Sequence, residues 1–139
     1  LALVACGAKE QSVTYRMETE QSGIAMVELM TFEAEGDKIV KITDKLEMDF
    51  SGFDDATVEQ LKTAFDEMTA QGNSVDGASC ESSFSGTTYT MTLTVDVESG
   101  AAAELGDMGL LQITGDAENG LSLKNTEEQL ASNGYTKVS

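Results

Sequence analysis

Apolar and polar residues alternate along much of the chain, and this period of two predicts β-strands with one buried face. The predicted strands are residues 12–18, 24–33, 38–50, 78–84 and 87–97. The last strand alternates most regularly and carries threonine along its polar face, which is typical of an antiparallel sheet covered on one side only. Glycine-containing turns are predicted at residues 21–23, 35–37 and 85–86.

One acidic residue interrupts the apolar face of the third predicted strand. The inward positions of this strand are predicted to be Val40, Ile42, Leu46, Met48 and Phe50. Asp44 has the same parity, so its carboxyl group would lie among core residues. An edge position or a β-bulge would relieve this conflict, and we expect one of the two at Asp44.

Apolar residues at spacings of three and four predict a helix between the third and fourth strands. Its buried face would consist of Val58, Leu61, Phe65 and Met68. Asp54 or Asp55 is suited to its N-cap, and Gly72 is expected just after its last turn. Farther along, residues 101–105 are compatible with a short helix, and residues 110–113 with a short strand or a helical turn.

A last helix is expected near the C-terminus, after a turn at Asn119-Gly120. Asn125 or Thr126 would cap it, Leu130 would anchor it in the core and Gly134 would end it. Together, the elements predict a two-layer α+β fold. The predicted sheet is antiparallel with about five strands, and one main helix and a C-terminal helix pack on one face.

Composition excludes several classes of function. The chain has 139 residues with no histidine, so neither a Ser-His-Asp or Cys-His catalytic site nor a histidine-ligated metal site is available. The net charge is −17, which disfavours nucleic acid as a partner because such binding depends on neutralising phosphates. The 40% apolar content supports a folded core.

The N-terminal residues Leu3-Val4-Ala5-Cys6 fit a lipobox, the motif at which bacterial lipoproteins are cleaved and acylated. We therefore expect residues 1–5 to be the remnant of a signal peptide. Lipid would be attached at Cys6, residues 6–12 would form a tether, and residues 13–139 would form a single domain. An ordinary apolar strand with a buried cysteine is the alternative.

The segment from Gly120 to Val138, GLSLKNTEEQLASNGYTKV, resembles the C-terminus of the YehR-like bacterial lipoproteins. The lipobox, the strand containing Tyr15, the hairpin at residues 36–38 and the threonine-rich strand at residues 87–97 are similar as well. This resemblance implies a small α+β lipoprotein of unknown function. Cys6 is the one functional residue that it transfers, and the strong acidity of this chain departs from the family pattern.

Several other residues are candidates for chemistry. Asp49, Asp54 and Asp55 are weak candidates for Ca²⁺ ligands, although they lack EF-hand spacing and also fit a strand end followed by a capped helix. Asp107, Asp116 and Glu118 form a still looser acidic group. Cys80 is expected to be a buried structural thiol, with a reactive or partner-bound thiol as the alternative.

The methionines and the carboxylates are further candidates for chemistry. The seven methionines suggest a copper site, but Met26 and Met30 lie on the same face of a predicted strand among core residues, so core packing is the expected role of the methionines. The 25 acidic residues supply many carboxylate pairs, none of which the sequence singles out.

The sequence thus predicts a lipid-anchored, extracytoplasmic protein of the bacterial cell envelope. It is expected to be a non-catalytic binding or interaction module, held to the membrane through Cys6, with no cofactor. The alternatives are a protein that binds a small ligand or Ca²⁺ through its acidic loops, and a carboxylate-dependent hydrolase. An envelope protein is a further candidate partner.

Overall fold

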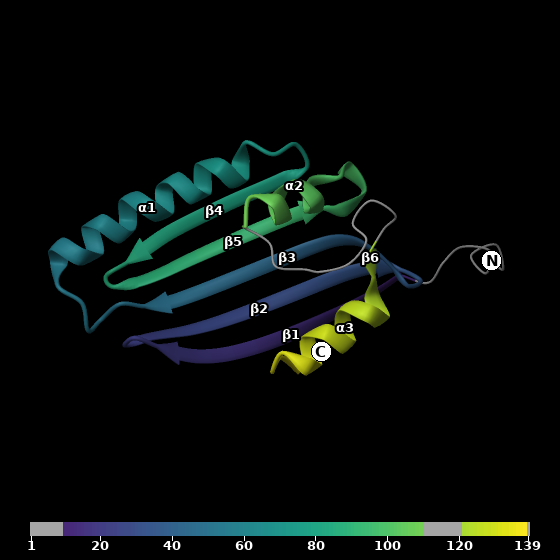
Figure 1. The fold of residues 1–139 in the computed structure, drawn as a ribbon, viewed down its shortest axis with the longest axis horizontal. Coiled ribbons are helices and arrows are strands. Elements are labelled where there is room, and N and C mark those ends of the chain that lie inside the picture. The colour runs from purple at the N-terminus through teal and green to yellow at the C-terminus, as the bar shows by residue number, and fades with distance from the viewer. Residues whose placement is uncertain (1–9, 110–120, 139) are drawn as a thin grey trace.

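The computed structural model describes residues 10–109 and 121–138 of the chain. In this part of the protein, one antiparallel sheet has the strand order β4-β5-β3-β2-β1-β7, and β6 pairs with β3 (Figure 1). The strands are β1 Glu10–Gln21, β2 Ile24–Glu35, β3 Lys38–Asp49, β4 Ala78–Ser85, β5 Thr88–Asp96, β6 Leu121–Ser122 and β7 Thr136–Lys137. The five long strands match the predicted ones, and β6 and β7 are two-residue additions.

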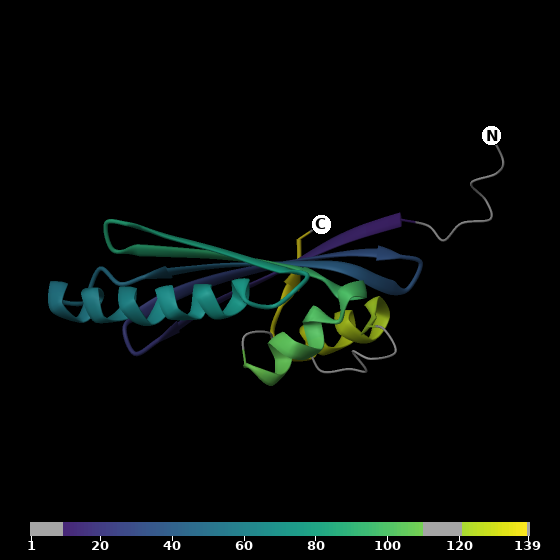
Figure 2. The same ribbon diagram turned by 90° about the horizontal axis from the view of Figure 1, so that it is seen from above.

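The helices all lie on one side of this sheet, which confirms the two-layer α+β arrangement (Figure 2). They are α1 Asp55–Asn73, α2 Ala101–Asp107 and α3 Leu123–Ser132, and a short 3₁₀ turn, η2 Val97–Ser99, precedes α2. Helix α1 runs beneath one half of the sheet, and α2 and α3 lie beneath the other half (Figure 2). The helical layer therefore has two separate parts. None of the helices in the described residues is long and apolar enough to cross a bilayer.

The strand β3 departs from the predicted alternation near its start. Glu33 pairs with Lys41 and Ala34 pairs with Ile39, so Val40 has no partner on β2 and forms a bulge. Ile39 and Ile42 are both fully buried as a result, whereas Val40 is only half-buried. The prediction that Val40 faces inward was therefore wrong, because an extra residue in one strand reverses the parity beyond it.

Asp44 lies neither at an edge nor at a bulge, so both expectations for it were wrong. It lies in the middle of β3, the strand between β2 and β5, where its pairing partners are Met30 and Leu93. Only 7% of the residue is exposed. The conflict seen in the sequence is therefore present in the folded protein, and a carboxyl group lies on the covered face of the sheet.

Helix α1 begins as predicted but ends later. Asp54 is its N-cap and accepts a hydrogen bond from the Thr57 amide at 2.7 Å. Gly72, however, lies inside the helix rather than after it. A Cβ atom added at Gly72 would lie 3.0 Å from the Cβ of Cys80, so this glycine lets the helix approach β4 closely.

Helix α3 begins three to four residues earlier than predicted. Its N-cap is Ser122, which accepts a hydrogen bond from the Asn125 amide, and not Asn125 or Thr126. Leu130 is buried and Gly134 follows the helix with a φ of +93°, both as expected. The expected segment 110–113 and the turn at residues 119–120 lie outside the described residues, as do Cys6, Asp116 and Glu118.

The buried core follows the two-part helical layer. Beneath α1, a cluster of rings joins Phe50, Phe65, Phe84 and Tyr89, with Phe65 stacked on Tyr89 at a centroid distance of 4.2 Å. Toward the other end, Phe32, Ile39 and Leu105 are fully buried. Both parts belong to one continuous apolar cluster.

Candidate functional site

A pocket of about 280 Å³ opens on the helix side of the sheet. Strands β1, β2, β3 and β5 supply most of its lining. Its lining residues are Met17, Thr19, Met26, Glu28, Met30, Asp44, Leu46, Met68, Met91, Gly109 and Tyr135. Met68 comes from α1, whereas Gly109 follows α2 and Tyr135 follows α3. The pocket therefore lies where the two parts of the helical layer leave the middle of the sheet uncovered.

A pair of carboxyl groups lies in the lining of this pocket. Met30 pairs with Asp44 and Glu28 pairs with Leu46, which makes Glu28 and Asp44 diagonal neighbours on the same face of the sheet. Glu28 acts on the Asp44 carboxyl group through its negative charge and a side-chain hydrogen bond. Asp44 Oδ1 is buried and has no hydrogen-bond partner among the described residues.

Burial of Asp44 raises the pKa of its carboxyl group to about 8, and the negative charge and hydrogen bond of Glu28 contribute to this rise. Two adjacent carboxyl groups cannot both ionise cheaply in a buried site. Asp44 therefore keeps its proton at neutral pH.

Tyr135 completes the polar part of the pocket. Its hydroxyl donates a hydrogen bond to Glu28 Oε1, and burial together with this contact raises the pKa of the Tyr135 hydroxyl. The Tyr135 amide donates to the Leu130 carbonyl at 2.9 Å, which fixes the start of the chain segment that leaves α3. The segment that follows α3 thus places the Tyr135 hydroxyl as a hydrogen-bond donor beside the acid pair.

Methionines form much of the apolar wall. Five of the seven methionines of the chain line the pocket. Met30 and Met91 are buried, as the expected core role requires, whereas Met17, Met26 and Met68 are only partly buried. The prediction that the methionines pack in the core was therefore incomplete, because Met17, Met26 and Met68 line an accessible pocket. Their side chains are flexible and polarisable, and they adapt to what they contact.

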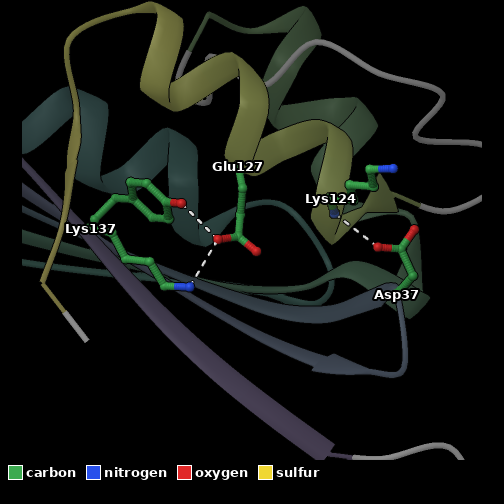
Figure 3. A network of polar contacts seen from close by, with 5 residues as sticks. Asp37, Lys124, Glu127 and Lys137 are labelled. Atoms are coloured by element: carbon green, nitrogen blue, oxygen red, sulfur yellow. Dashed lines mark hydrogen bonds and ion pairs between the residues drawn. The ribbon is translucent and has the colours of Figure 1, made fainter.

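Two polar contacts hold α3 against the sheet beside the pocket. In the first, Asp37 of the β2–β3 turn accepts a hydrogen bond from the Lys124 amide at 2.9 Å (Figure 3). Asp37 also accepts a hydrogen bond from the Ser122 hydroxyl at 2.5 Å. These bonds lower the pKa of the Asp37 carboxyl, that from Ser122 most strongly. The Asp37 carbonyl also accepts from the Leu123 amide.

The second contact joins α3 to β1 and β7. Glu127 accepts a hydrogen bond from the Tyr15 hydroxyl at 2.7 Å and forms an ion pair with Lys137 at 3.2 Å (Figure 3). Burial and the bond to Glu127 raise the pKa of Tyr15 to about 12. Because Tyr135 lies between α3 and β7, these contacts position the donor that reaches the acid pair.

The acidic candidates Asp49, Asp54, Asp55 and Asp107 are not among the residues that line this pocket. Asp49 accepts a hydrogen bond from the Ser51 amide at 2.9 Å, Asp54 caps α1, and Asp55 lies in the first turn of that helix. These roles correspond to the strand end and capped helix that the sequence left open as the alternative. Asp107 is the last residue of α2. Within residues 10–109 and 121–138, no three His, Cys, Asp or Glu side chains gather as metal ligands do.

Cys80 is buried beneath α1, in agreement with the expected structural thiol. Burial raises the pKa of its thiol group. A raised pKa disfavours the thiolate, which is the reactive form.

Sequence reasoning missed the acid pair and Tyr135 as members of one site. The sequence contained a signal for Glu28, because it has the same parity as Met26 and Met30 and so belongs to the same face of its strand. Asp44 was already notable as an acidic residue on the apolar face of the next strand. The hairpin turn at Gly36 makes these two positions neighbours. Nothing in the sequence pattern places Tyr135 beside them, because that depends on how the C-terminal segment returns to the sheet.

Comparison with known proteins identifies the family. Residues 11–136 match the family described as Protein of unknown function (DUF1307). The chain belongs to this family. An uncharacterized lipoprotein of Listeria innocua, similar to this DUF1307 chain, is 28% identical over 98% of the chain and 86% of the relative. An uncharacterized lipoprotein of Listeria monocytogenes is 26% identical over 99% of the chain and 87% of the relative.

Solved structures show the same fold. The NMR structure of the E. coli YehR protein has a TM-score of 0.69 at 18% identity, covering 94% of this chain and 92% of that protein. An NMR structure of a protein from Streptococcus pneumoniae has a TM-score of 0.59 at 15% identity and covers 94% and 86% of the two chains. The expected resemblance of this DUF1307 protein to the YehR-like family is confirmed.

Proposed function

We propose that this protein is a lipid-anchored, non-catalytic binding protein of the bacterial cell envelope that holds a small ligand in the methionine-lined pocket. The observation that carries the proposal is the buried carboxyl oxygen of Asp44, which lines this pocket without a partner among the described residues. Buried polar atoms are nearly always hydrogen-bonded, so an unpartnered one in a pocket is suited to a ligand.

The proposed anchor is supported by the sequence and by the relatives. Leu3-Val4-Ala5-Cys6 has the form of a lipobox, with Cys6 as the acylated residue. Both Listeria relatives carry the name lipoprotein. An acylated Cys6 would place the folded domain outside the cytoplasm, at a membrane surface.

The same acid pair also favours a second candidate, a carboxyl-dependent hydrolase. Two carboxyl groups that share a proton are the acid–base groups of aspartic proteases. Glycosidases keep their two carboxyl groups about 5 Å or more apart, whereas Glu28 and Asp44 bond to each other. The pocket volume of 280 Å³ is at the small end for ligand sites, which favours holding a small molecule over processing a polymer.

Native mass spectrometry of the lipidated protein, extracted gently from its own membranes, tests the binding function. We expect a small-molecule adduct on the wild-type protein and none on a Met68→Trp variant, whose larger side chain fills the pocket. Gln60→Trp on the exposed side of α1 is the matched control. An adduct that persists in Met68→Trp, or a wild-type protein free of adduct but crosslinked to one stoichiometric protein partner, would contradict ligand binding in this pocket.

An activity screen separates the hydrolase from the binding protein. Casein and chromogenic glycosides and esters, incubated with the protein between pH 4 and 8, should give no turnover above buffer. Turnover that disappears in Glu28→Gln would establish the enzyme instead.

A further inference from the structure

We propose that the ligand of this pocket is a primary ammonium ion carried on a short apolar body. This inference rests on the binding function proposed above and names the chemistry of its ligand. The argument uses the unpartnered oxygen, the charge of the acid pair and the apolar wall.

The unpartnered oxygen of Asp44 favours a ligand with a hydrogen-bond donor. Only 7% of Asp44 is exposed, and its Oδ1 atom has no hydrogen-bond partner within the described residues. Glu28 already receives the hydroxyl hydrogen of Tyr135. No lysine or arginine occurs among the described lining residues, so the donor that Asp44 lacks has to come from the ligand.

The charge of the pair calls for a cation. Asp44 stays protonated beside Glu28, because burial and the negative charge of Glu28 disfavour its ionised form. An ammonium group supplies three N–H donors and one positive charge. When it binds, Asp44 releases its proton to solvent and its carboxylate lies beside the ammonium. One positive charge thus replaces another, and the buried oxygen gains its donor.

The apolar side chains of the lining favour a ligand whose remaining part is apolar. Met17, Met26, Met30, Met68, Met91 and Leu46 offer thioether and aliphatic groups around the acid pair. A volume of 280 Å³ corresponds to the space of about nine water molecules, which suits a short alkyl or aryl chain. The net charge of −17 favours the approach of any cation.

Metal ions fit these groups less well. Hard cations such as Ca²⁺ require six to eight oxygen ligands, whereas this lining offers two carboxyl groups and two hydroxyl groups. A soft ion held by the thioethers would leave the Asp44 oxygen without a hydrogen-bond donor.

The pH dependence of binding follows from the released proton. The titratable groups of the lining are Glu28, Asp44 and Tyr135, and Cys80 on β4 also senses the charge of Asp44. Tyr135 and Cys80 both have raised pKa values and stay neutral near pH 7. Between pH 6 and 7, the affinity for an ammonium ion should therefore rise by about tenfold, as expected when binding one ligand releases about one proton.

NMR of methionine methyl groups labelled with ¹³C tests this proposal on the full chain carrying Cys6→Ser, which prevents acylation. The probes are hexylamine, hexanol and hexanoate, which share one alkyl chain and differ in charge. Hexylamine should shift the methyl signals of the five lining methionines saturably. Met48 and Met108, which do not line the pocket, are internal controls. Calorimetry in two buffers of different ionisation enthalpy should report release of about one proton per hexylamine at pH 7.

Two variants assign the effect to the acid pair. Asp44→Asn should weaken hexylamine binding at least about tenfold and leave hexanol binding unchanged, whereas Glu81→Gln on the exposed face of β4 changes the net charge equally and should have no effect. If Asp44→Asn proves poorly folded, Glu28→Gln replaces it with the same expectation.

The outcomes separate the ligand class from the binding function. Hexanol or hexanoate binding as tightly as hexylamine, or hexylamine binding unaffected by Asp44→Asn, would overturn the ammonium ion and leave a binding pocket in place. Absence of any shift with hexylamine at millimolar concentration would also overturn the ammonium ion, and the adduct experiment above then decides the function separately.

Discussion

A single carboxyl group in the middle of the sheet, that of Asp44, determines the chemistry of the pocket. A sheet position between two neighbouring strands is normally apolar on its covered face, and an isolated buried charge there would be costly. The protein tolerates Asp44 because its raised pKa keeps the carboxyl group neutral near pH 7. The parity of these residues could be derived from the sequence, but their pairing could not, since it depends on the register of the hairpin.

The raised pKa of Asp44 has a consequence for stability that a pH titration measures. The folded protein holds a proton on Asp44 from about pH 4 to about pH 8, whereas the unfolded chain releases it near pH 4. Unfolding therefore releases a proton in this range, and the free energy of unfolding should fall as pH rises from 4 to 8.

Asp44→Asn should remove this slope, which is at most about 1.4 kcal/mol per pH unit, and should leave the variant more stable than wild type at pH 7. Urea unfolding at a series of pH values, with Glu81→Gln as the control, provides the measurement. Equal slopes in Asp44→Asn and wild type would show that the pair is not protonated in the folded state.

Gly72 is a second residue whose role depends on the tertiary structure. The sequence placed it after the helix, because glycine is common there. In the structure it is a contact residue, and its missing side chain lets α1 lie against Cys80. No local pattern distinguishes these two uses of glycine.

Gly72→Val should therefore lower the free energy of unfolding by about 1–3 kcal/mol, the usual cost of overpacking a close contact. Gln71→Val, at the exposed neighbouring position, should cost about 0.5 kcal/mol through helix propensity alone. Chemical denaturation compares the two variants. A similar loss for both would mean that α1 can move away from β4 without cost.

At the scale of elements, α3 is held by side chains from strands far away in sequence. Alternation and helical spacing predicted the long strands and α1 because those signals are local. The start of α3 was misplaced because its N-terminus is fixed partly by Asp37, 87 residues before Lys124. Sequence patterns near Asn125 contain no information about that contact.

Asp37→Ala should loosen α3 while leaving α1 unchanged. The Ser122 hydroxyl, the Lys124 amide and the first turn of α3 would lose their acceptor, so amide hydrogens of α3 should exchange faster. Hydrogen exchange followed by mass spectrometry measures this, with Glu35→Ala in the same hairpin as the control. Unchanged exchange in α3 would show that Ser122 alone caps the helix.

The pH dependence of this contact has the opposite sign from that of Asp44. The pKa of Asp37 is lowered by its bonds to Ser122 and Lys124. Its contribution to stability is therefore present above the ordinary pKa of aspartate and is lost as pH falls through the lowered value.

For the whole molecule, the two-layer fold followed from the order of strands and helices, whereas the pocket did not. Its existence depends on α1 and the α2–α3 part covering different areas of one sheet (Figure 2). That gap is a property of tertiary packing, and no single stretch of sequence contains it.

The proposed anchor concerns the whole molecule as well. Cys6→Ala should move the protein from the membrane fraction to the soluble fraction in its native host, because acyl chains supply the membrane affinity. Fractionation and immunoblotting measure this, and Cys80→Ala, which alters the buried thiol instead, is the matched control. Persistent membrane association of Cys6→Ala would contradict the anchor.

The contacts of the C-terminal segment also imply an order in which parts of the protein fold. Residues 50–96 form α1, β4 and β5 close together along the chain, whereas Tyr15 and Glu127 are 112 positions apart and meet only across a long loop. Closing longer loops costs more entropy, so the C-terminal segment should join the sheet late in folding. Tyr135 would then reach Glu28 as one of the last steps. A chain that has not finished folding would hold its acid pair without the tyrosine, and the pocket would become complete only together with the protein itself.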